Sequence, residues 1–464
     1  MNKFILCLFF GFILHSSEKL NVLFIISDDL CATALSSYGN QVCKTPNIDR
    51  LAERGTLFTN AYCQATYCGP SRASFMSGYY PDATGVFGYV SGRKAIGDRE
   101  TWAEYFKNRG YHSARVSKIF HMPVPKGIEL GTDGSDDPRS WDEKYNAQGP
   151  EWKAPGIGET LEGGKRPPVG GNTFVRVEAD GDDLVHSDGK AAAKAVDLLN
   201  KYKDMDKPFW LGVGFVRPHV PFVAPKKYYK DYPWEEIVLP KKLKGDWDDI
   251  PQKGINYKTS KNMKMSIEQQ KKAVSAYYAS VTYMDAQVGK VLDALEQSGQ
   301  ADNTIVIFTS DHGYHLGEHD FWAKVSLKDE SIRVPLIISI PGGEKQISDS
   351  MVELLDLFPS TAKMCGLEVP KRLQGKDISG LLQSPQNEVR DYIFSANGKG
   401  WVLQGKRWSY TKYKGKAPNE ELFDLSKDPG QYINQVNNPE YASVLQKMRS
   451  SFKARMAEIK TNDL

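Results

Sequence analysis

The chain alternates between short, uninterrupted apolar runs and longer segments in which apolar residues recur every three or four positions. The apolar runs at residues 21–27, 208–215, 304–310 and 334–340 predict strands that are buried on both faces of a sheet. An apolar stripe at residues 274–295 predicts a helix that packs on that sheet. This alternation predicts an α/β fold in which a mostly parallel sheet is sandwiched by helices.

The hydrophobic pattern changes near residue 377. Residues 392–413 predict short aromatic strands. The chain has 464 residues, more than one hydrophobic core usually serves. We therefore expect a main domain at residues 18–376 and a smaller C-terminal subdomain at residues 377–464.

The first 17 residues have the pattern of a secretory signal peptide. Lys3 supplies a positive charge, and the apolar run from Phe4 to Leu14 is too short to span a membrane. No later segment is apolar enough to do so. We expect an exported protein, periplasmic or secreted, with no membrane span. The absence of any Asn-x-Ser/Thr acceptor favours a bacterial source.

Charge and cysteine content restrict the partners and the covalent chemistry. The formal net charge of +3 argues against a general nucleic-acid-binding surface. Export permits disulfides, and the chain has six cysteines, at positions 7, 31, 43, 63, 68 and 365. A bond between Cys31 and Cys43 is one option, and the sequence leaves the pairing open.

A cysteine stands at the predicted start of a helix in residues 67–78. Pro70 suits a first helical turn, and Gly69 lets the backbone fold closely behind Cys68. Arg72 lies four residues further on, on the same helix face, where a guanidinium can pair with an oxyanion. From these residues alone, Cys68 is either a nucleophile at an anion site or a buried cysteine at a helix start.

Acidic residues follow two of the predicted strands directly. Asp28-Asp29 ends the first apolar run, and Asp311-His312 ends the run at residues 304–310. If the two strands are parallel neighbours, both pairs emerge at the same edge of the sheet, where three carboxylates would require a cation. An oxygen-rich set favours a hard ion such as Ca²⁺ or Mg²⁺. The alternative is that each pair caps the helix after it.

The motif Cys68-x-Pro-Ser-Arg72, followed by Ala-Ser-Phe-Met-Ser-Gly, resembles the signature of the type I sulfatases. The resemblance implies an alkaline-phosphatase-like fold with a C-terminal antiparallel sheet. It also implies that a maturation enzyme oxidises Cys68 to formylglycine, whose hydrate attacks the sulfur of a sulfate ester. Asp28, Asp29, Asp311 and His312, with the modified Cys68, would bind the metal, Ca²⁺ or alternatively Mg²⁺.

Three further motifs resemble those of iduronate-2-sulfatase-like enzymes. In Lys118-x-x-His121 the two side chains would bind sulfate and assist the nucleophile. In Arg-Pro-His219-x-Pro-Phe the histidine would protonate the leaving oxygen, and in Glu-His-x-x-x-Ala-Lys324 the lysine would hold a sulfate oxygen. Without the resemblance, Lys118 and His121 read as solvated residues at a strand end and His219 as structural.

Four residues beside these motifs are expected to bind the substrate: His315, His319, Trp322 and Arg217. The histidines at 312, 315 and 319 also permit a zinc cluster, but Gly313 and Gly317 interrupt the helix that would align them. Residues 123–185 predict a long irregular insertion whose aromatic rings either stack on a sugar or pin the loop.

These observations leave three hypotheses for the function. The first is an exported sulfatase that acts on a sulfated carbohydrate, from the chain end. The second is a phosphomonoester or phosphonate-ester hydrolase on the same fold, and the third is a sulfated-glycan-binding protein without activity. Each proposed functional position carries a competent residue, which favours an enzyme over a binding protein.

Overall fold

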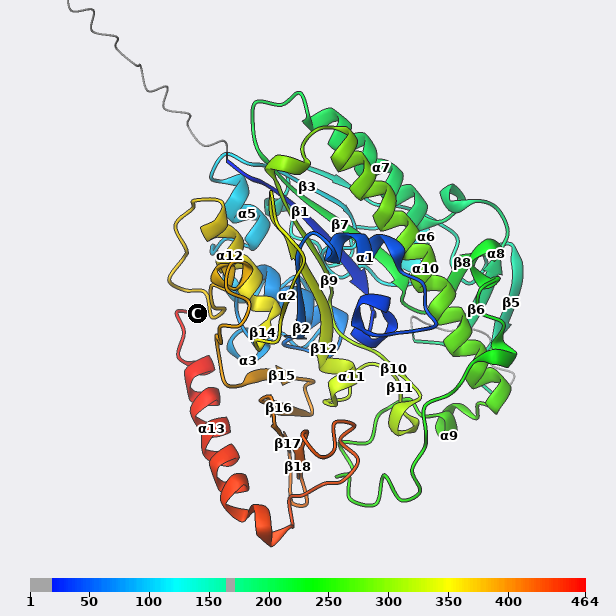
Figure 1. The fold of residues 1–464 in the computed structure, drawn as a ribbon, viewed down its shortest axis with the longest axis vertical. Coiled ribbons are helices and arrows are strands. Elements are labelled where there is room, and N and C mark those ends of the chain that lie inside the picture. The colour runs from blue at the N-terminus through cyan, green and yellow to red at the C-terminus, as the bar shows by residue number, and fades with distance from the viewer. Residues whose placement is uncertain (1–18, 164–171) are drawn as a thin grey trace, which may run out of the picture.

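The computed structural model describes residues 19–163 and 172–464, so the predicted signal peptide lies outside the described residues. A nine-stranded sheet forms the centre of this part of the chain (Figure 1). Its strands, in spatial order, are β13 (Gln346–Ser348), β2 (Thr56–Tyr62), β12 (Arg333–Ser339), β9 (Thr304–Ser310), β1 (Asn21–Asp28), β7 (Phe209–Pro218), β3 (His112–Ser117) and β4 (Glu143–Tyr145), with β14 (Val352–Glu353) paired to β2.

The middle of this sheet is parallel. β1 pairs in parallel with β9 on one side and with β7 on the other, and β7 pairs in parallel with β3. Only β12 runs antiparallel to both of its neighbours, β2 and β9, among the described strands. The prediction of a mostly parallel sheet is confirmed, and the carboxyl ends of β1 and β9 meet at one edge.

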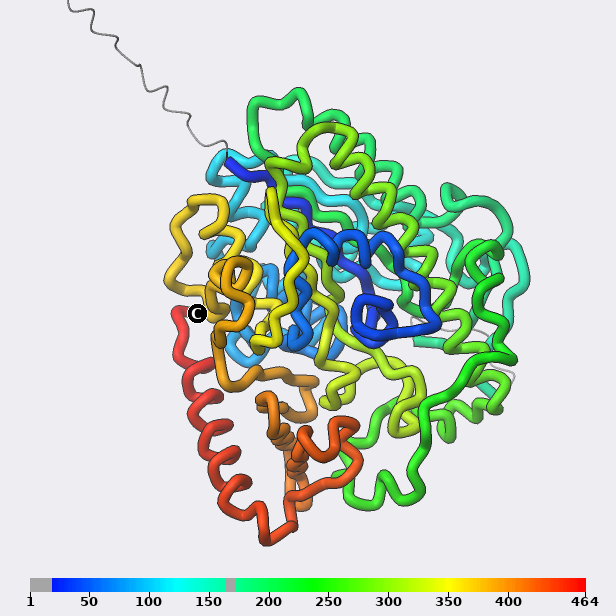
Figure 2. The backbone as a smooth tube through the Cα atoms, in the orientation of Figure 1, coloured from blue at the N-terminus to red at the C-terminus, as the bar shows by residue number. Residues whose placement is uncertain are grey.

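Helices cover both faces of the sheet, as the tube in Figure 2 shows. One face carries α1 (Pro46–Ala52), α7 (Ser187–Tyr202) and α10 (Ile267–Gln297), and the other carries α2 (Cys68–Ser77), α5 (Trp102–Lys107) and α12 (Leu357–Met364). The side chains of β1 alternate between the two cores: Leu23 packs in the first and Phe24 in the second. Because both faces of the strand are buried, its sequence is a continuous run of apolar residues.

Shorter helices lie in the connections between these elements. They are α3 (Pro81–Thr84), α4 (Arg93–Ile96), α6 (Lys126–Leu130), α8 (Lys226–Tyr229), α9 (Ser260–Met263) and α11 (Asp329–Ile332). Helix α12 begins at Leu357, so Pro359 falls in its first turn, where proline is tolerated.

The described part of the insertion at residues 123–185 contains more regular structure than the sequence predicts. Its strands β5 (Gly156–Thr160) and β6 (Val175–Ala179) form a three-stranded sheet with β8 (Phe222–Pro225). Two of its aromatic side chains are buried: Trp141 packs against Trp210, and Phe174 packs against Phe222. These rings pin the insertion to the main domain.

The C-terminal part contains an antiparallel sheet of four strands, β15 (Ile393–Ala396), β16 (Gly400–Gln404), β17 (Trp408–Tyr413) and β18 (Glu420–Asp424). Helix α13 (Ala442–Lys460) packs on it through Leu445 and Met448 (Figure 1). Beyond this helix, Asp463 returns to the main domain and pairs with Arg99 at 2.8 Å. The domain boundary at residue 377 stays a prediction.

A search of the described helices finds none with the length and apolar character needed to cross a membrane.

Candidate active site

Cys68 is the first residue of helix α2, as the surrounding sequence predicts, and it is 1% exposed. Gly69 lies so close to the backbone of Gly88 that a Cβ atom there would stand 2.5 Å from the carbonyl oxygen. Only glycine fits at this close approach. The turn therefore places the Cys68 side chain at the amino end of a helix whose start is packed tightly against a neighbouring loop.

The thiol of Cys68 touches charged groups from three other segments. Its Sγ lies 3.1 Å from Lys324 Nζ, 3.3 Å from His312 Nε2 and 3.7 Å from Asp29 Oδ1. Burial raises the pKa of the Cys68 thiol, and the charge of Asp28 raises it further. Because the thiolate is the reactive form of cysteine, the unmodified side chain is a poor nucleophile in this setting.

The two acidic pairs meet beside Cys68. Ser27 and Ser310 are paired in register on β1 and β9, so the residues that follow them emerge together. One ligand atom from each of Asp28, Cys68, Asp311 and His312 lies within 4.8 Å of the others, and a second such group joins Asp28, Asp29, Cys68 and His219. The expectation that both pairs gather at one point of the sheet edge is confirmed.

The carboxylates of this cluster fit a bound cation. Asp28 Oδ1 and Asp29 Oδ2 are buried and have no hydrogen-bond partner among the described residues. Burial raises the pKa of Asp28, but Lys118 and then His219 lower it, and the result lies well below its usual range. The nearest basic groups to these two oxygens lie beyond hydrogen-bond distance, Arg72 at 3.6 Å and His219 at 3.7 Å, so the two buried, charged carboxylates are a ligand set for a hard divalent ion.

Arg72 and Lys118 face the same carboxylates. Arg72 donates from Nε to Asp311 Oδ2 at 2.8 Å, and its second terminal nitrogen has no hydrogen-bond partner among the described residues. Lys118 pairs with Asp28 through Nζ. Both side chains are fully buried, so their charges act on the site with little screening by water.

Lys324 is presented by a strained segment. It follows the hairpin of β10 (His315–Leu316) and β11 (Trp322–Ala323), and its Nζ lies 2.7 Å from Asp29 Oδ1. The residues on either side of it, Ala323 and Val325, have φ of 64° and 86°. A left-handed conformation is costly for a β-branched residue and is kept only where neighbouring contacts hold it.

Two contacts from distant segments hold this conformation. The amide of Val325 donates to the carbonyl of Thr66 at 3.0 Å, and Asn397 Nδ2 donates to the carbonyl of Val325 at 2.6 Å. Asn397 lies between β15 and β16, so the C-terminal sheet takes part in positioning Lys324.

The two histidines carried over from the sequence motifs also reach the site. His219 Nε2 lies 3.7 Å from Asp29 Oδ2, and Nδ1 donates to the carbonyl of Val220. Burial lowers the pKa of His219 to about 3, although Asp29 opposes that shift. Burial lowers the pKa of His121 to about 2, and the charge of Lys118 adds to the effect.

The loop that carries His219 is fixed by a buried ion pair. Arg217 donates from one terminal nitrogen to both carboxylate oxygens of Glu151 at 2.6 Å, and from the other to the carbonyls of His219 and Pro221. Its guanidinium is 2% exposed and occupied by these partners. The expectation that Arg217 binds substrate is therefore revised, because its terminal donors are already used to hold the loop.

The other three candidate substrate-binding residues are held by protein groups rather than gathered around Cys68. Trp322 is fully buried and packs on Phe174, and His315 Nε2 shares a hydrogen bond with Ser326 Oγ at 2.7 Å. His319 Nδ1 lies 3.0 Å from Asp246 Oδ2, beside a separate cavity of about 410 Å³. In the described structure, His312 alone among the three neighbouring histidines joins the metal-ligand groups.

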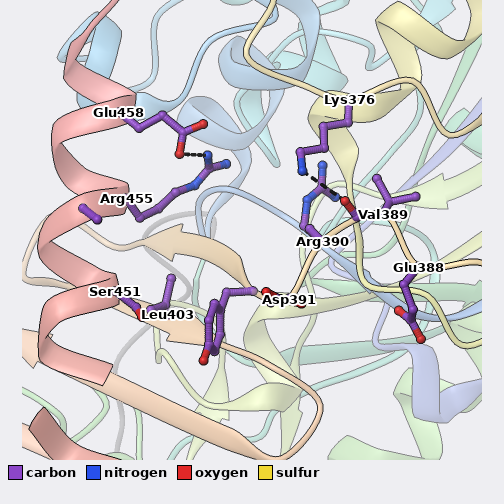
Figure 3. A pocket seen from close by; sticks show the side chains of 11 residues that line it. Lys376, Glu388, Val389, Arg390, Asp391, Leu403, Ser451, Arg455 and Glu458 are labelled. Atoms are coloured by element: carbon purple, nitrogen blue, oxygen red, sulfur yellow. Dashed lines mark hydrogen bonds and ion pairs between the residues drawn. The ribbon is translucent and has the colours of Figure 1, made fainter. Parts of the chain in front are cut away.

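Other cavities lie away from this chemistry. Figure 3 shows one of about 510 Å³ between α13 and the segment 376–391. Within it, Arg455 pairs with Glu458 and Lys376 donates to the Val389 carbonyl, while Glu388 pairs with Lys406 and Arg390 pairs with Asp356 outside the cavity. It contains none of the residues that surround Cys68.

Several residues at the site carry no sequence signal. Glu151 stands in the long insertion, Asn397 stands in the C-terminal sheet, and Tyr277 of α10 donates to the Asp29 carbonyl at 2.7 Å. Each of them is separated from its partner by dozens of residues. No local pattern in the chain indicates these contacts.

The sheet order, the helices on both faces and the carboxylate cluster at one buried edge of the sheet define an alkaline-phosphatase-like fold. The sulfatase family matches residues 20–367, and the C-terminal region of N-sulphoglucosamine sulphohydrolase matches residues 317–458. A sulfatase of Formosa agariphila is 33% identical over 458 residues, which cover 93% of this chain and 86% of that protein. Human iduronate 2-sulfatase is 35% identical over 411 residues, which cover 77% of this chain and 71% of that protein.

The chain belongs to the sulfatase family and is a sulfuric ester hydrolase. Among solved structures, a phosphonate monoester hydrolase of Agrobacterium radiobacter superposes with a TM-score of 0.78 at 21% identity, over 95% of this chain and 96% of that chain. That likeness concerns the fold alone.

Proposed function

We propose that the protein is a formylglycine-dependent sulfatase that removes sulfate from a carbohydrate, acting from the end of a sulfated polysaccharide or its oligosaccharides. The observation that carries the proposal is the position of Cys68 Sγ, 3.1 Å from Lys324 Nζ and 3.7 Å from Asp29 Oδ1. The carbohydrate class is supported by the similarity to iduronate 2-sulfatase. We further propose export through the predicted signal peptide at residues 1–17.

A divalent metal would be held by Asp28, Asp29, Asp311, His312 and the side chain at position 68. The free oxygens of Asp28 and Asp29 support this set, and oxygen ligands favour Ca²⁺, with Mg²⁺ as the alternative. The metal supplies Lewis-acid polarisation of a sulfate oxygen, and formylglycine supplies, as its hydrate, an oxygen nucleophile.

The chain's own cations would neutralise the sulfate group as charge builds on its oxygens. One terminal nitrogen of the Arg72 guanidinium has no hydrogen-bond partner among the described residues and lies 3.6 Å from Asp28 Oδ1, and Lys118 and Lys324 hold their charges within the same buried cluster. Preorganised donors in a water-excluded site are usually the largest contribution to catalysis of this kind. These three residues would bind the anion and orient it.

His219 and His121 would transfer protons during the reaction. His219 faces the site through Nε2, and its low pKa, caused by burial, would rise when a negatively charged sulfate ester binds beside it. Protonated His219 would then donate to the departing sugar oxygen, a step that contributes about 10²- to 10⁴-fold in rate. His121 stays neutral and would accept a proton from the nucleophile.

The test is the mass of the peptide that contains residue 68, from protein exported by its native host. Conversion of cysteine to formylglycine lowers the mass by about 18 Da, the difference between a thiol side chain and the aldehyde of the modified nucleophile. The Cys68→Ala variant should lose the mass change and activity together. The matched control Cys365→Ala, at another buried cysteine, should keep both. An unmodified thiol in active wild-type protein would refute the mechanism.

The phosphonate-ester hydrolase remains the second candidate because of the shared fold. It is favoured if phosphate or phosphonate esters turn over faster than sulfate esters under equal conditions.

A further inference from the structure

An aromatic ring stands beside the nucleophile turn without a role in the chemistry described above. Tyr89 is 50% exposed, and a Cβ atom at Gly69 would lie 2.9 Å from Tyr89 Cδ1. Since Gly69 is the neighbour of Cys68 in the chain, the ring of Tyr89 lies directly over the start of α2. A large ring that stays half exposed at such a place can contact whatever binds at position 68.

The ring of Tyr89 is held in one orientation. Its centroid lies 4.3 Å from that of His121 with an interplanar angle of 28°, so the two rings are stacked. Tyr67 meets it edge-on at 6.1 Å, and Ser135 donates through Oγ to the Tyr89 carbonyl. Burial raises the pKa of Tyr89, and the charges of Lys324 and Cys68 also act on it, which agrees with its position at the rim of the site.

A second tyrosine, Tyr257, lies beside the segment that carries Lys324. Both of its neighbours in the chain bond to Trp322: Asn256 Nδ2 donates to the Trp322 carbonyl at 2.9 Å, and the Trp322 amide donates to the Lys258 carbonyl at 3.0 Å. The hydroxyl of Tyr257 is buried and has no hydrogen-bond partner among the described residues. Burial raises the pKa of Tyr257, and the charges of Lys324, Asp29 and Tyr89 act on it in turn. A buried hydroxyl without a partner costs free energy unless a ligand satisfies it.

We propose that Tyr89 and Tyr257 form the subsite for the sugar ring that carries the sulfate. Tyr89 stacks its exposed side on the apolar face of a pyranose, while Tyr257 hydrogen-bonds to a hydroxyl group of that ring. An aromatic ring suits the C–H face of a sugar, and a few convergent polar groups set its orientation. This inference rests on the proposed function and names the part of the substrate that the two residues recognise.

The experiment compares recognition of the sugar with recognition of the anion. The KM and kcat of purified wild type, Tyr89→Leu and Tyr257→Phe are measured on a 2-O-sulfated uronate disaccharide and on glucose 6-sulfate. Inhibition by inorganic sulfate, which lacks the sugar, is measured in parallel. We expect Tyr89→Leu to lower kcat/KM about tenfold on the better substrate, mostly through KM, and to leave the inhibition constant of sulfate unchanged.

Two further variants sharpen the comparison. Tyr89→Phe keeps the ring and should lose less than Tyr89→Leu, while Tyr257→Phe should lose several-fold in kcat/KM through the missing hydroxyl. The matched control is Tyr145→Leu, which removes a partly exposed tyrosine on β4 and should behave as wild type.

Each result decides between the proposals. If the wild type turns over the saccharides and Tyr89→Leu equals it, the subsite is wrong and the sulfatase proposal stands. If Tyr89→Leu weakens sulfate inhibition as much as saccharide turnover, Tyr89 acts on the anion site through His121, and the sugar subsite is again wrong. If the wild type hydrolyses phosphonate esters and neither saccharide, the proposed function fails and this inference fails with it.

Discussion

The substitution Asn397→Asp should impair catalysis although Asn397 lies in the C-terminal sheet. The side chain is 7% exposed and donates from Nδ2 to the carbonyl of Val325 at 2.6 Å, next to Lys324. Aspartate keeps the bonds that Oδ1 accepts from the amides of Lys399 and Gly400, both 3.0 Å long, but it cannot donate to Val325. The substitution therefore removes one hydrogen bond and places a carboxylate oxygen against the Val325 carbonyl, so its control must carry the same change of charge.

The magnitude follows from the burial of that contact. Leaving a buried carbonyl unsatisfied costs about 1–3 kcal/mol. Because Val325 is strained at a φ of 86°, its backbone should relax once the bond is lost. This relaxation would move Lys324 away from Asp29. If the whole cost falls on the transition state, kcat/KM drops about 5- to 150-fold, at 1.36 kcal/mol per factor of ten. Steady-state kinetics on a sulfate ester, with urea unfolding in parallel, measures both effects.

Asn419→Asp is the matched control. Asn419 is also 7% exposed and donates through Nδ2 to the carbonyls of Tyr413 and Gly415, at 2.9 and 2.7 Å. Its Oδ1 accepts from Lys412 Nζ at 3.0 Å, a bond that aspartate keeps. This variant should lose free energy of unfolding, because two carbonyls lose their donor, and keep its activity. Wild-type kcat/KM in Asn397→Asp would show that the strained segment does not depend on this bond for the position of Lys324.

Three other predictions concern the buried charges of the molecule. Glu151→Gln should lower kcat at least about tenfold with little change in KM, because Arg217 then holds the loop of His219 less firmly; a parallel change in KM would contradict this role. Removal of metal with EDTA should abolish activity, Ca²⁺ should restore it, and Asp28→Asn should retain less metal by mass spectrometry than wild type; full activity in metal-free protein would exclude the proposed cation site. Burial raises the pKa of Asp183, but Lys290 and Lys227 lower it to about 2, so Asp183→Asn should lose about 2 kcal/mol of unfolding free energy above pH 4. Because this pKa is depressed, the difference from wild type should vanish in urea titrations as the pH falls from 4 through 2, and a constant difference would argue against the ion pairs as its cause.

The sequence predicted the central strands well because their signal is local. Strand β9 covers the predicted residues 304–310, and β1 extends the predicted run at 21–27 by one residue. The meeting of the two acidic pairs was expected only on the condition that these strands are parallel neighbours, and the structure meets that condition. The insertion at 123–185 was predicted less well, because its strand β6 is buried mainly by pairing with β5 and β8.

The residues predicted for the site fall into two groups: those that the structure gathers beside Cys68 and those whose side chains pack elsewhere. Asp28, Cys68 and Asp311 are marked by motifs at strand and helix ends, and the structure brings them together; their roles stay predictions. Arg217 and Trp322 stand beside equally clear motifs, yet their side chains are committed to the interior. Adjacency in sequence did not indicate which way each side chain points.

The sequence by itself determined the strand pattern, the turn at Cys68 and the acidic pairs, since each depends on residues only a few positions apart. Tertiary structure alone decided which distant groups support them. Asn397 meets Val325 across 72 positions of the chain, and Glu151 meets Arg217 across 66. Such contacts arise from how the layers pack and carry no periodicity or spacing along the chain, which is why only the folded molecule displays them.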